Sequence, residues 1–200
     1  MGRIASTPMS MFIAVLVTCA VSATALTFAF EATWEQIEEQ ERIARERALR
    51  EVLEDAETFT GADQATLECL DEVAGEVAVE GAFVASGAQG QVLGLGVLVA
   101  PRGYGGPMRM AVGVDRDGKV TGVSIISHKE TPGLGTKVIT EPWFTEQFQG
   151  WLTEEVEDSD QGFDAVSGAT KSSTGVRKGV QAAERVYIAW PECGGGDIAE

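Results

Sequence analysis

The fold class is indicated first by residues 108–127, which read MRMAVGVDRDGKVTGVSIIS in a chain of 200 residues. Two Val-rich runs, 108–114 and 120–127, flank Asp117-Gly118, a dipeptide typical of a hairpin turn. Similar runs at 77–84 and 91–100 are bounded by Gly, Pro or other turn residues. Because short turns join neighbouring strands antiparallel, these runs predict one antiparallel sheet.

Helices are expected before and after these strands in the sequence. A helix over 143–152 would bury one aromatic face, and a final helix over 172–187 carries an apolar side. Residues 58–75 predict a loop and then a short helix that holds Leu67 and Leu70. The expected fold is therefore α+β, an antiparallel-rich twisted sheet with flanking helices.

The N-terminal part predicts a single transmembrane helix before this domain. Residues 9–30 are strongly apolar, and at about 1.5 Å per residue they reach about 33 Å, enough to cross a bilayer core. A cleaved signal peptide is the alternative, because Ala23-Thr24-Ala25 resembles a cleavage site, but the apolar run continues beyond it. Arg3 before the span favours a cytoplasmic N-terminus, although four arginines follow the span. Residues 31–57 predict a charged helix with Glu–Arg pairs four residues apart.

Composition excludes several function classes. The formal net charge of −16 opposes binding to phosphate backbones, so no nucleic acid is expected as a partner. One histidine and three cysteines argue against zinc or iron–sulfur centres, so we assign no metal ligand. Cys69 and Cys193 follow the span and can either pair or remain free thiols.

The loop over residues 164–173, DAVSGATKSS, has the composition of a site for a bulky anionic ligand. Its small residues let the backbone approach a ligand, and the helix that follows offers free N–H groups to a phosphate. Ser172 or Ser173 is expected to cap that helix. A Walker A loop is excluded because Thr170, not Gly, precedes Lys171. An ordinary turn with a helix cap is the alternative that these residues alone leave open.

The same loop resembles a known motif. Asp164, Ser167, Gly168, Ala169 and Thr170 match the flavinylation motif of the FMN-binding domain found in ion-pumping membrane redox complexes. The resemblance implies that a flavin transferase joins the phosphate of FMN to the Thr170 hydroxyl, next to Lys171. Thr170 is then an acceptor, and no catalytic residue is assigned.

A second loop, His128 to Gly135, resembles the other hallmark of this family, and Gly103–Pro107 resembles a third segment. The expected cofactor-binding residues of these segments are Tyr104, Glu130, Thr131, Pro132, Gly133, Leu134 and Gly135. His128, the sole histidine, is either a structural residue that ends a strand or a proton relay.

Within the family the chain is most similar to the G subunit of Rnf complexes, the ion-translocating ferredoxin:NAD oxidoreductases. This implies an electron-transfer subunit with covalent FMN and no turnover of its own, working with other membrane and cytoplasmic subunits. The alternatives are the C subunit of a sodium-pumping NADH:quinone reductase, which is usually longer, and a solitary exported flavoprotein electron carrier.

The expected domain plan follows from span, motifs and resemblance. It comprises a cytoplasmic N-terminus (1–8), a transmembrane helix (9–30), a charged helix and linker (31–74), the covalent FMN-binding domain (75–190) and a C-terminal tail (191–200). The expected location is the cytoplasmic membrane, with the C-terminal domain on its extracytoplasmic side.

Overall fold

The computed structural model describes residues 8–151, 163–196 and 198, and its chain divides into two units, 1–43 and 44–200. Some of our predictions fall outside the described residues. They concern the first seven residues, Leu152 and part of the C-terminal tail. Helix α1, Pro8–Val52, forms the first unit and continues into the second.

The first unit is an apolar helix followed by charged turns. Within α1, large apolar side chains such as Met9, Phe12 and Phe28 are more than half exposed. The helix is long and apolar enough to cross a membrane. Further along, Arg42 pairs with Glu39 at 2.8 Å.

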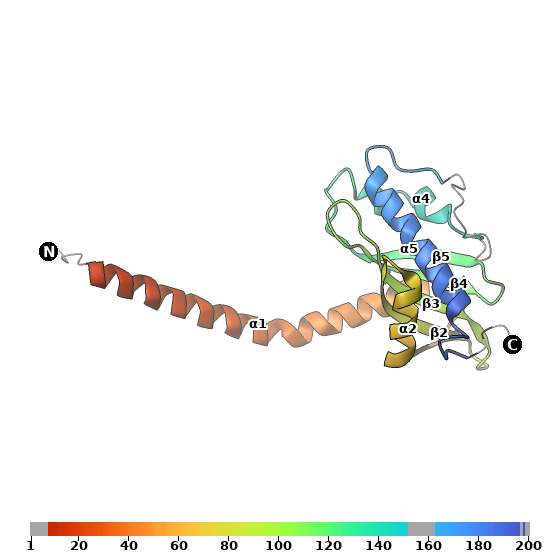
Figure 1. Ribbon diagram of the computed structural model, residues 1–200, viewed down its shortest axis with the longest axis horizontal. Coiled ribbons are helices and arrows are strands. Elements are labelled where there is room, and N and C mark those ends of the chain that lie inside the picture. The colour runs from red at the N-terminus through yellow and green to blue at the C-terminus, as the bar shows by residue number, and fades with distance from the viewer. Residues whose placement is uncertain (1–7, 152–162, 197, 199–200) are drawn as a thin grey trace. The chain divides into compact units, whose positions relative to one another are not determined.

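The second unit is built on a five-stranded antiparallel sheet whose strands follow in sequence order (Figure 1). Its strands are β1 (Thr58–Gly61), β2 (Ala78–Ser86), β3 (Val92–Ala100), β4 (Arg109–Asp115) and β5 (Val120–Ser127). The predicted strands are confirmed to within two residues, and Gly118 takes a φ of 74° in the predicted hairpin turn. The predicted loop at residues 58–61 is wrong, because these residues pair with residues 83–86 as the edge strand β1.

One face of the sheet is covered by two helices, α2 (Gln64–Ala74) and α5 (Thr170–Ala189) (Figure 1). Between them and the sheet lies the main core, to which β3 contributes Leu95, Val97 and Val99. Strand residues alternate between faces, so Leu98 points to the opposite side. There it packs with Leu49 and Val52 from the last turns of α1.

Glycines let α1 approach the sheet closely. A Cβ added to Gly96 would lie 2.6 Å from a methyl carbon of Leu49, and one added to Gly113 would lie 2.6 Å from the carbonyl oxygen of Val52. The Thr121 hydroxyl donates to that same carbonyl. The last turns of α1 are therefore part of the folded domain.

The aromatic segment after β5 forms a shorter helix than predicted. This helix is α4 (Pro142–Glu146); the short helix α3 (Lys137–Thr140) precedes it, and turns follow it as far as Gly150, whose φ is 80°. Phe144 and Phe148 are fully buried in an edge-to-face pair. Trp143 is 44% exposed, so the expectation of one long helix with a buried aromatic face is wrong for this residue.

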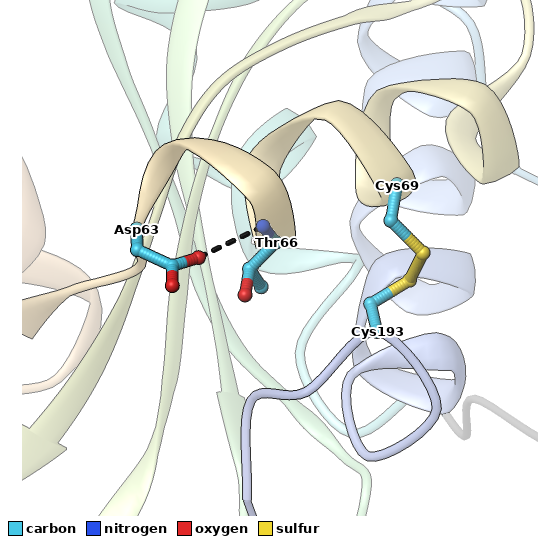
Figure 2. The surroundings of a disulfide bond; sticks show 4 residues. All are labelled: Asp63, Thr66, Cys69 and Cys193. Carbon is cyan, nitrogen blue, oxygen red and sulfur yellow. Dashed lines mark hydrogen bonds between the residues drawn. A yellow bond between two sulfur atoms is a disulfide. The ribbon is translucent and has the colours of Figure 1, made fainter.

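A disulfide joins Cys69 of α2 to Cys193, which follows α5, as Figure 2 shows. It decides between the paired and free thiols that the sequence left open. The bond closes a separation of 124 residues and joins α2 to the turn that follows α5. Nearby, the Asp63 carboxylate caps α2 by accepting the Thr66 N–H at 2.8 Å (Figure 2), and hydrogen bonding to Thr66 lowers the pKa of Asp63.

Candidate functional site

The two motif loops meet at the N-terminal end of α5, where they enclose a cavity of about 260 Å³. This volume is slightly below the range of about 300–1,000 Å³ usual for small-molecule sites, as expected for a pocket open on one side. Three segments that are remote in sequence form its walls. The lining residues are Tyr104, Glu130, Thr131, Leu134, Gly135, Gly168, Ala169, Thr170, Lys171 and Ser172.

Helix α5 begins at Thr170 without a side-chain cap. The prediction that Ser172 or Ser173 caps this helix is wrong, because both lie inside its first turn and are buried. The first N–H groups of a helix carry partial positive charge and have no partner within the helix. At this end of α5 they remain available to an anion.

The three hydroxyls at the start of α5 differ in their environment. Ser172 donates to a carboxylate oxygen of Glu130 at 2.7 Å. Ser173 donates to the carbonyl of Ala169 at 3.0 Å and accepts the N–H of Val166 at 3.1 Å. Thr170, by contrast, is exposed and lines the cavity.

Hydrogen bonds to backbone groups hold the turn before α5. Gln147 accepts the N–H of Asp164 at 2.8 Å, and Ala169 N–H donates to the carbonyl of Val166 at 2.9 Å. Gly168 takes a φ of 78°, which suits glycine, and a Cβ there would lie 3.4 Å from a methyl carbon of Leu134. The sequence did not predict that Gln147 binds the N–H of Asp164 or that Ser173 binds the N–H of Val166. Each contact joins turns whose proximity sequence spacing does not reveal.

Two exposed side chains border the cavity. Tyr104 is 71% and Leu134 51% exposed, and both come from loops. The ammonium of Lys171 lies 5.8 Å from the centre of the Tyr104 ring, a cation–π arrangement. An aromatic ring, an aliphatic side chain and a cation therefore surround one opening.

The wall opposite α5 contains a buried acid. Glu130 is 5% exposed, and its carboxylate accepts hydrogen bonds from Gly105 N–H and from Ser172. Its own N–H donates to Nδ1 of His128 at 3.2 Å. His128 thus has a structural contact at the end of β5.

The predicted site residues divide into two groups. Of the thirteen, nine line the cavity, whereas Pro132, Gly133, Asp164 and Ser167 are exposed and do not line it. Gly133 has a φ of 77° and shapes the loop through its backbone, and its N–H donates to the Thr136 hydroxyl at 3.0 Å. Ser172 lines the cavity although we had predicted it only as a possible helix cap.

A larger hollow of about 730 Å³ lies along β5, away from both motif loops. Among the described residues, its lining includes Glu51, Glu54, Asp55 and Asp115 and no lysine or arginine. A phosphate would be repelled there, so we do not assign the cofactor to it. Within the described residues, no cluster of three His, Cys, Asp or Glu side chains could hold a metal ion.

The cavity at α5 fits FMN by its chemistry. The uncapped helix end and Lys171 suit a phosphate, while Tyr104 and Leu134 offer apolar surface to a flat ring. Gly168 and Gly135 both line the cavity, and neither adds a side chain to it. The residues that line the cavity therefore fit such a group.

Comparisons with known proteins agree with this chemistry. Residues 103–184 match the family model of the FMN-binding domain. The chain is 33% identical over 175 residues to the G subunit of the ion-translocating oxidoreductase complex of Stutzerimonas stutzeri, covering 81% of this chain and 73% of that protein. It is 30% identical over 183 residues to the G subunit of the Na(+)-translocating ferredoxin:NAD(+) oxidoreductase complex of Acetobacterium woodii, covering 84% and 86%.

Two further comparisons are a shorter sequence match and a structural alignment. The G subunit of the ion-translocating oxidoreductase complex of Aliivibrio fischeri is 42% identical over 97 residues, which span 44% of this chain and just under half, 46%, of that protein. The crystal structure of the C subunit of the Na(+)-translocating NADH-quinone reductase from Parabacteroides distasonis aligns with a TM-score of 0.48 at 20% identity. That alignment covers 77% of this chain and 94% of the other.

Proposed function

The chain belongs to the family of G subunits of ion-translocating oxidoreductase complexes, and we propose that it carries FMN covalently on Thr170 as an electron-transfer subunit of such a complex. The observation that carries this proposal is the exposure of one hydroxyl at the uncapped end of α5, in a cavity suited to FMN. The apolar part of α1 and the family together indicate a membrane protein.

Thr170 is the acceptor because its neighbours are already engaged. The hydroxyls of Ser172 and Ser173 are buried and hydrogen-bonded, so esterifying either one would break contacts within the fold. The Thr170 hydroxyl is exposed to an approaching enzyme. Attachment therefore needs no opening of the core.

The attachment step is a phosphoryl transfer. In that step the Thr170 hydroxyl would be the nucleophile towards the flavin phosphate of a flavin adenine dinucleotide donor, its proton would pass to a base, and AMP would be the leaving group. A threonine hydroxyl is a weak nucleophile at neutral pH, so the flavin transferase must supply its activation. The resulting phosphodiester bears one negative charge beside the start of α5 and Lys171.

Bound in this way, FMN supplies the ability to accept and release electrons. The contribution of the chain is to hold the group and to orient it. Tyr104 and Leu134 provide the apolar surfaces that border the opening, and the Thr170 ester prevents loss of the cofactor. The other subunits of the complex supply the reactions with ferredoxin and NAD and the movement of ions.

We place the folded domain on the extracytoplasmic side of the membrane. The Cys69–Cys193 disulfide supports this placement, since structural disulfides persist in oxidising compartments and are rare in the cytosol. The flavin transferase would then act on that side.

Replacing Thr170 by valine tests the attachment site. The full-length chain, produced with the flavin transferase, should give a fluorescent band under ultraviolet light after denaturing electrophoresis. Thr170→Val keeps the side-chain shape and removes the oxygen, so its band should be dark. Thr174→Val, one turn further along α5, is the matched control and should fluoresce as the unmodified chain does. A fluorescent Thr170→Val band would refute the assignment.

A further inference from the structure

The Glu130 side chain is the one acid among the described residues that line the cavity, and it is almost fully buried in a chain with an excess of acidic residues. A buried carboxylate loses its hydration and costs free energy unless donors replace the water. Both of its oxygens do have donors. Gly105 N–H reaches Oε1 at 3.1 Å, and the Ser172 hydroxyl reaches Oε2 at 2.7 Å.

These contacts join three segments that are otherwise remote in the chain. Gly105 is 25 residues before Glu130 and belongs to the turn that carries Tyr104. Ser172 is 42 residues after it, two positions beyond Thr170 in the first turn of α5. The Glu130 side chain thus links the turn that carries Tyr104 to the first turn of α5, which carries Thr170.

The surroundings are shaped to hold this carboxylate. A Cβ added to Gly103 would lie 2.1 Å from Oε1, and one added to Gly135 would lie 2.2 Å from Oε2. Neither position could carry a larger side chain without displacing the acid. The two glycines therefore make space for Glu130 and are needed less for their own backbone conformation, since neither has a positive φ.

The position at a helix end adds a favourable field. Ser172 lies in the first turn of α5, where the helix dipole favours negative charge. Charge-assisted hydrogen bonds to a fixed carboxylate are stronger than neutral ones and restrict geometry more tightly. A negative charge held here also stabilises the start of α5 before any phosphate is attached.

We propose that Glu130 is a positioning residue, which braces the Tyr104 turn against the first turn of α5 and so holds the Thr170 hydroxyl in the orientation that flavin attachment requires. This inference rests on the proposed role of Thr170 as acceptor. Because each oxygen of Glu130 accepts a hydrogen bond within the fold, the residue acts through Gly105 and Ser172.

The test compares two substitutions in the full-length chain with purified flavin transferase and flavin adenine dinucleotide. Glu130→Gln can keep both contacts, since its amide oxygen can accept from Gly105 and its NH₂ can donate to the Ser172 oxygen. Glu130→Ala loses both. We expect attachment to Glu130→Gln within about threefold of the normal rate, and attachment to Glu130→Ala slowed about tenfold to a hundredfold.

Two further variants keep the test decisive. Ser172→Ala removes one contact and leaves the carboxylate in place, so it should also slow attachment. This variant keeps the proposal testable if Glu130→Ala does not fold. Glu146→Gln, an exposed acid on α4, is the matched control and should change nothing. Equal defects in Glu130→Gln and Glu130→Ala would show that the two hydrogen bonds, which glutamine can keep, do not position the acceptor, and would overturn the brace.

Hydrogen exchange of the flavin-free chain gives a readout that is independent of attachment. The Gly105 amide should exchange faster in Glu130→Ala than in the unmodified chain and remain protected in Glu130→Gln. Unchanged protection in Glu130→Ala would contradict the proposal. If the unmodified chain is labelled at Thr170 while Glu130→Ala is labelled at the same rate, only the brace fails; if Thr170 is never labelled, the proposed function fails.

Discussion

Glu184 is a second buried acid, and unlike Glu130 it lies away from the site, on the core side of α5. It is 1% exposed, and the desolvation that burial causes raises its pKa from 4.5 to about 7, although the charge of Arg185 opposes this shift. A carboxyl that is harder to ionise in the folded state than in the unfolded state makes folding dependent on pH.

The sign of this dependence follows from the raised pKa. Below pH 4.5 the group is protonated in both states, so it does not penalise folding. As the pH rises from 4.5 to about 7, only the unfolded state loses the proton, and stability falls by an amount on the order of 3 kcal/mol.

We therefore expect Glu184→Gln to unfold at higher urea concentration than the unmodified chain at pH 8, by up to about 3 kcal/mol, with the difference shrinking towards pH 5. Equilibrium unfolding of the full chain in detergent at both pH values measures this. Glu72→Gln, at an exposed position of α2, is the control. A Glu184→Gln chain that is no more stable at pH 8 would show that the buried carboxylate is compensated.

The residues of the site show how far sequence reasoning extends. The motif in 164–170 and the loop 130–135 could be found because each is continuous in the chain, and the structure brings both to one cavity. The engagement of Ser172 by Glu130 spans 42 residues and follows no local pattern, so it could not be predicted. The motif pointed to Thr170 as the acceptor, and the fold adds that the hydroxyls of Ser172 and Ser173 are buried and hydrogen-bonded.

At the scale of elements, the close contact between α1 and the sheet depends on glycines in neighbouring strands. Gly113 of β4 and Gly122 of β5 are register partners, and both lie under Val52. They differ in the space available. A Cβ at Gly113 would lie 2.6 Å from the Val52 carbonyl oxygen and 2.3 Å from the Thr121 hydroxyl, whereas one at Gly122 would meet Val52 at ordinary contact distances of 3.5 Å or more.

Gly113→Ala should therefore destabilise the domain by about 1–3 kcal/mol, because the added methyl group forces the helix backbone off the sheet. Gly122→Ala should be tolerated and serves as the matched control. Denaturant unfolding of the two variants measures this difference in stability. Equal stabilities would mean that the end of α1 is not packed as the structure describes.

The same scale explains which elements could be predicted. Strands β2 to β5 are Val-rich runs of seven to nine residues between turn residues, and so their periodicity and boundaries are visible in the sequence. Strand β1 has only four residues, and its conformation depends on pairing with residues 83–86. The aromatic segment was predicted as one helix because Phe144 and Phe148 are four residues apart, but the regular helix ends at Glu146.

For the whole molecule, the disulfide constrains the folded unit most strongly. Cys69 and Cys193 enclose β2 to β5 and α5, so the bond removes much of the freedom of the unfolded chain. In the loop-entropy model a closed loop of this length contributes up to about 5 kcal/mol.

The bond also gives a test of sidedness. In cells that produce the chain, we expect Cys69 and Cys193 to resist a large maleimide reagent after denaturation and to react only after reduction. Cys19, which is free, should react in either case. Cys69→Ser should expose Cys193 to the reagent without reduction and lower the melting temperature. Two reactive thiols at positions 69 and 193 in the unreduced natural chain would contradict both the disulfide and an oxidising location.

The most direct test of the account is peptide mass spectrometry of the full-length chain isolated from membranes of cells that make the flavin transferase. The account predicts one modified peptide, in which fragmentation places FMN, joined through its phosphate, on Thr170, while Ser167, Ser172 and Ser173 are unmodified. An unmodified Thr170 in that preparation, or FMN on one of the serines, would contradict it.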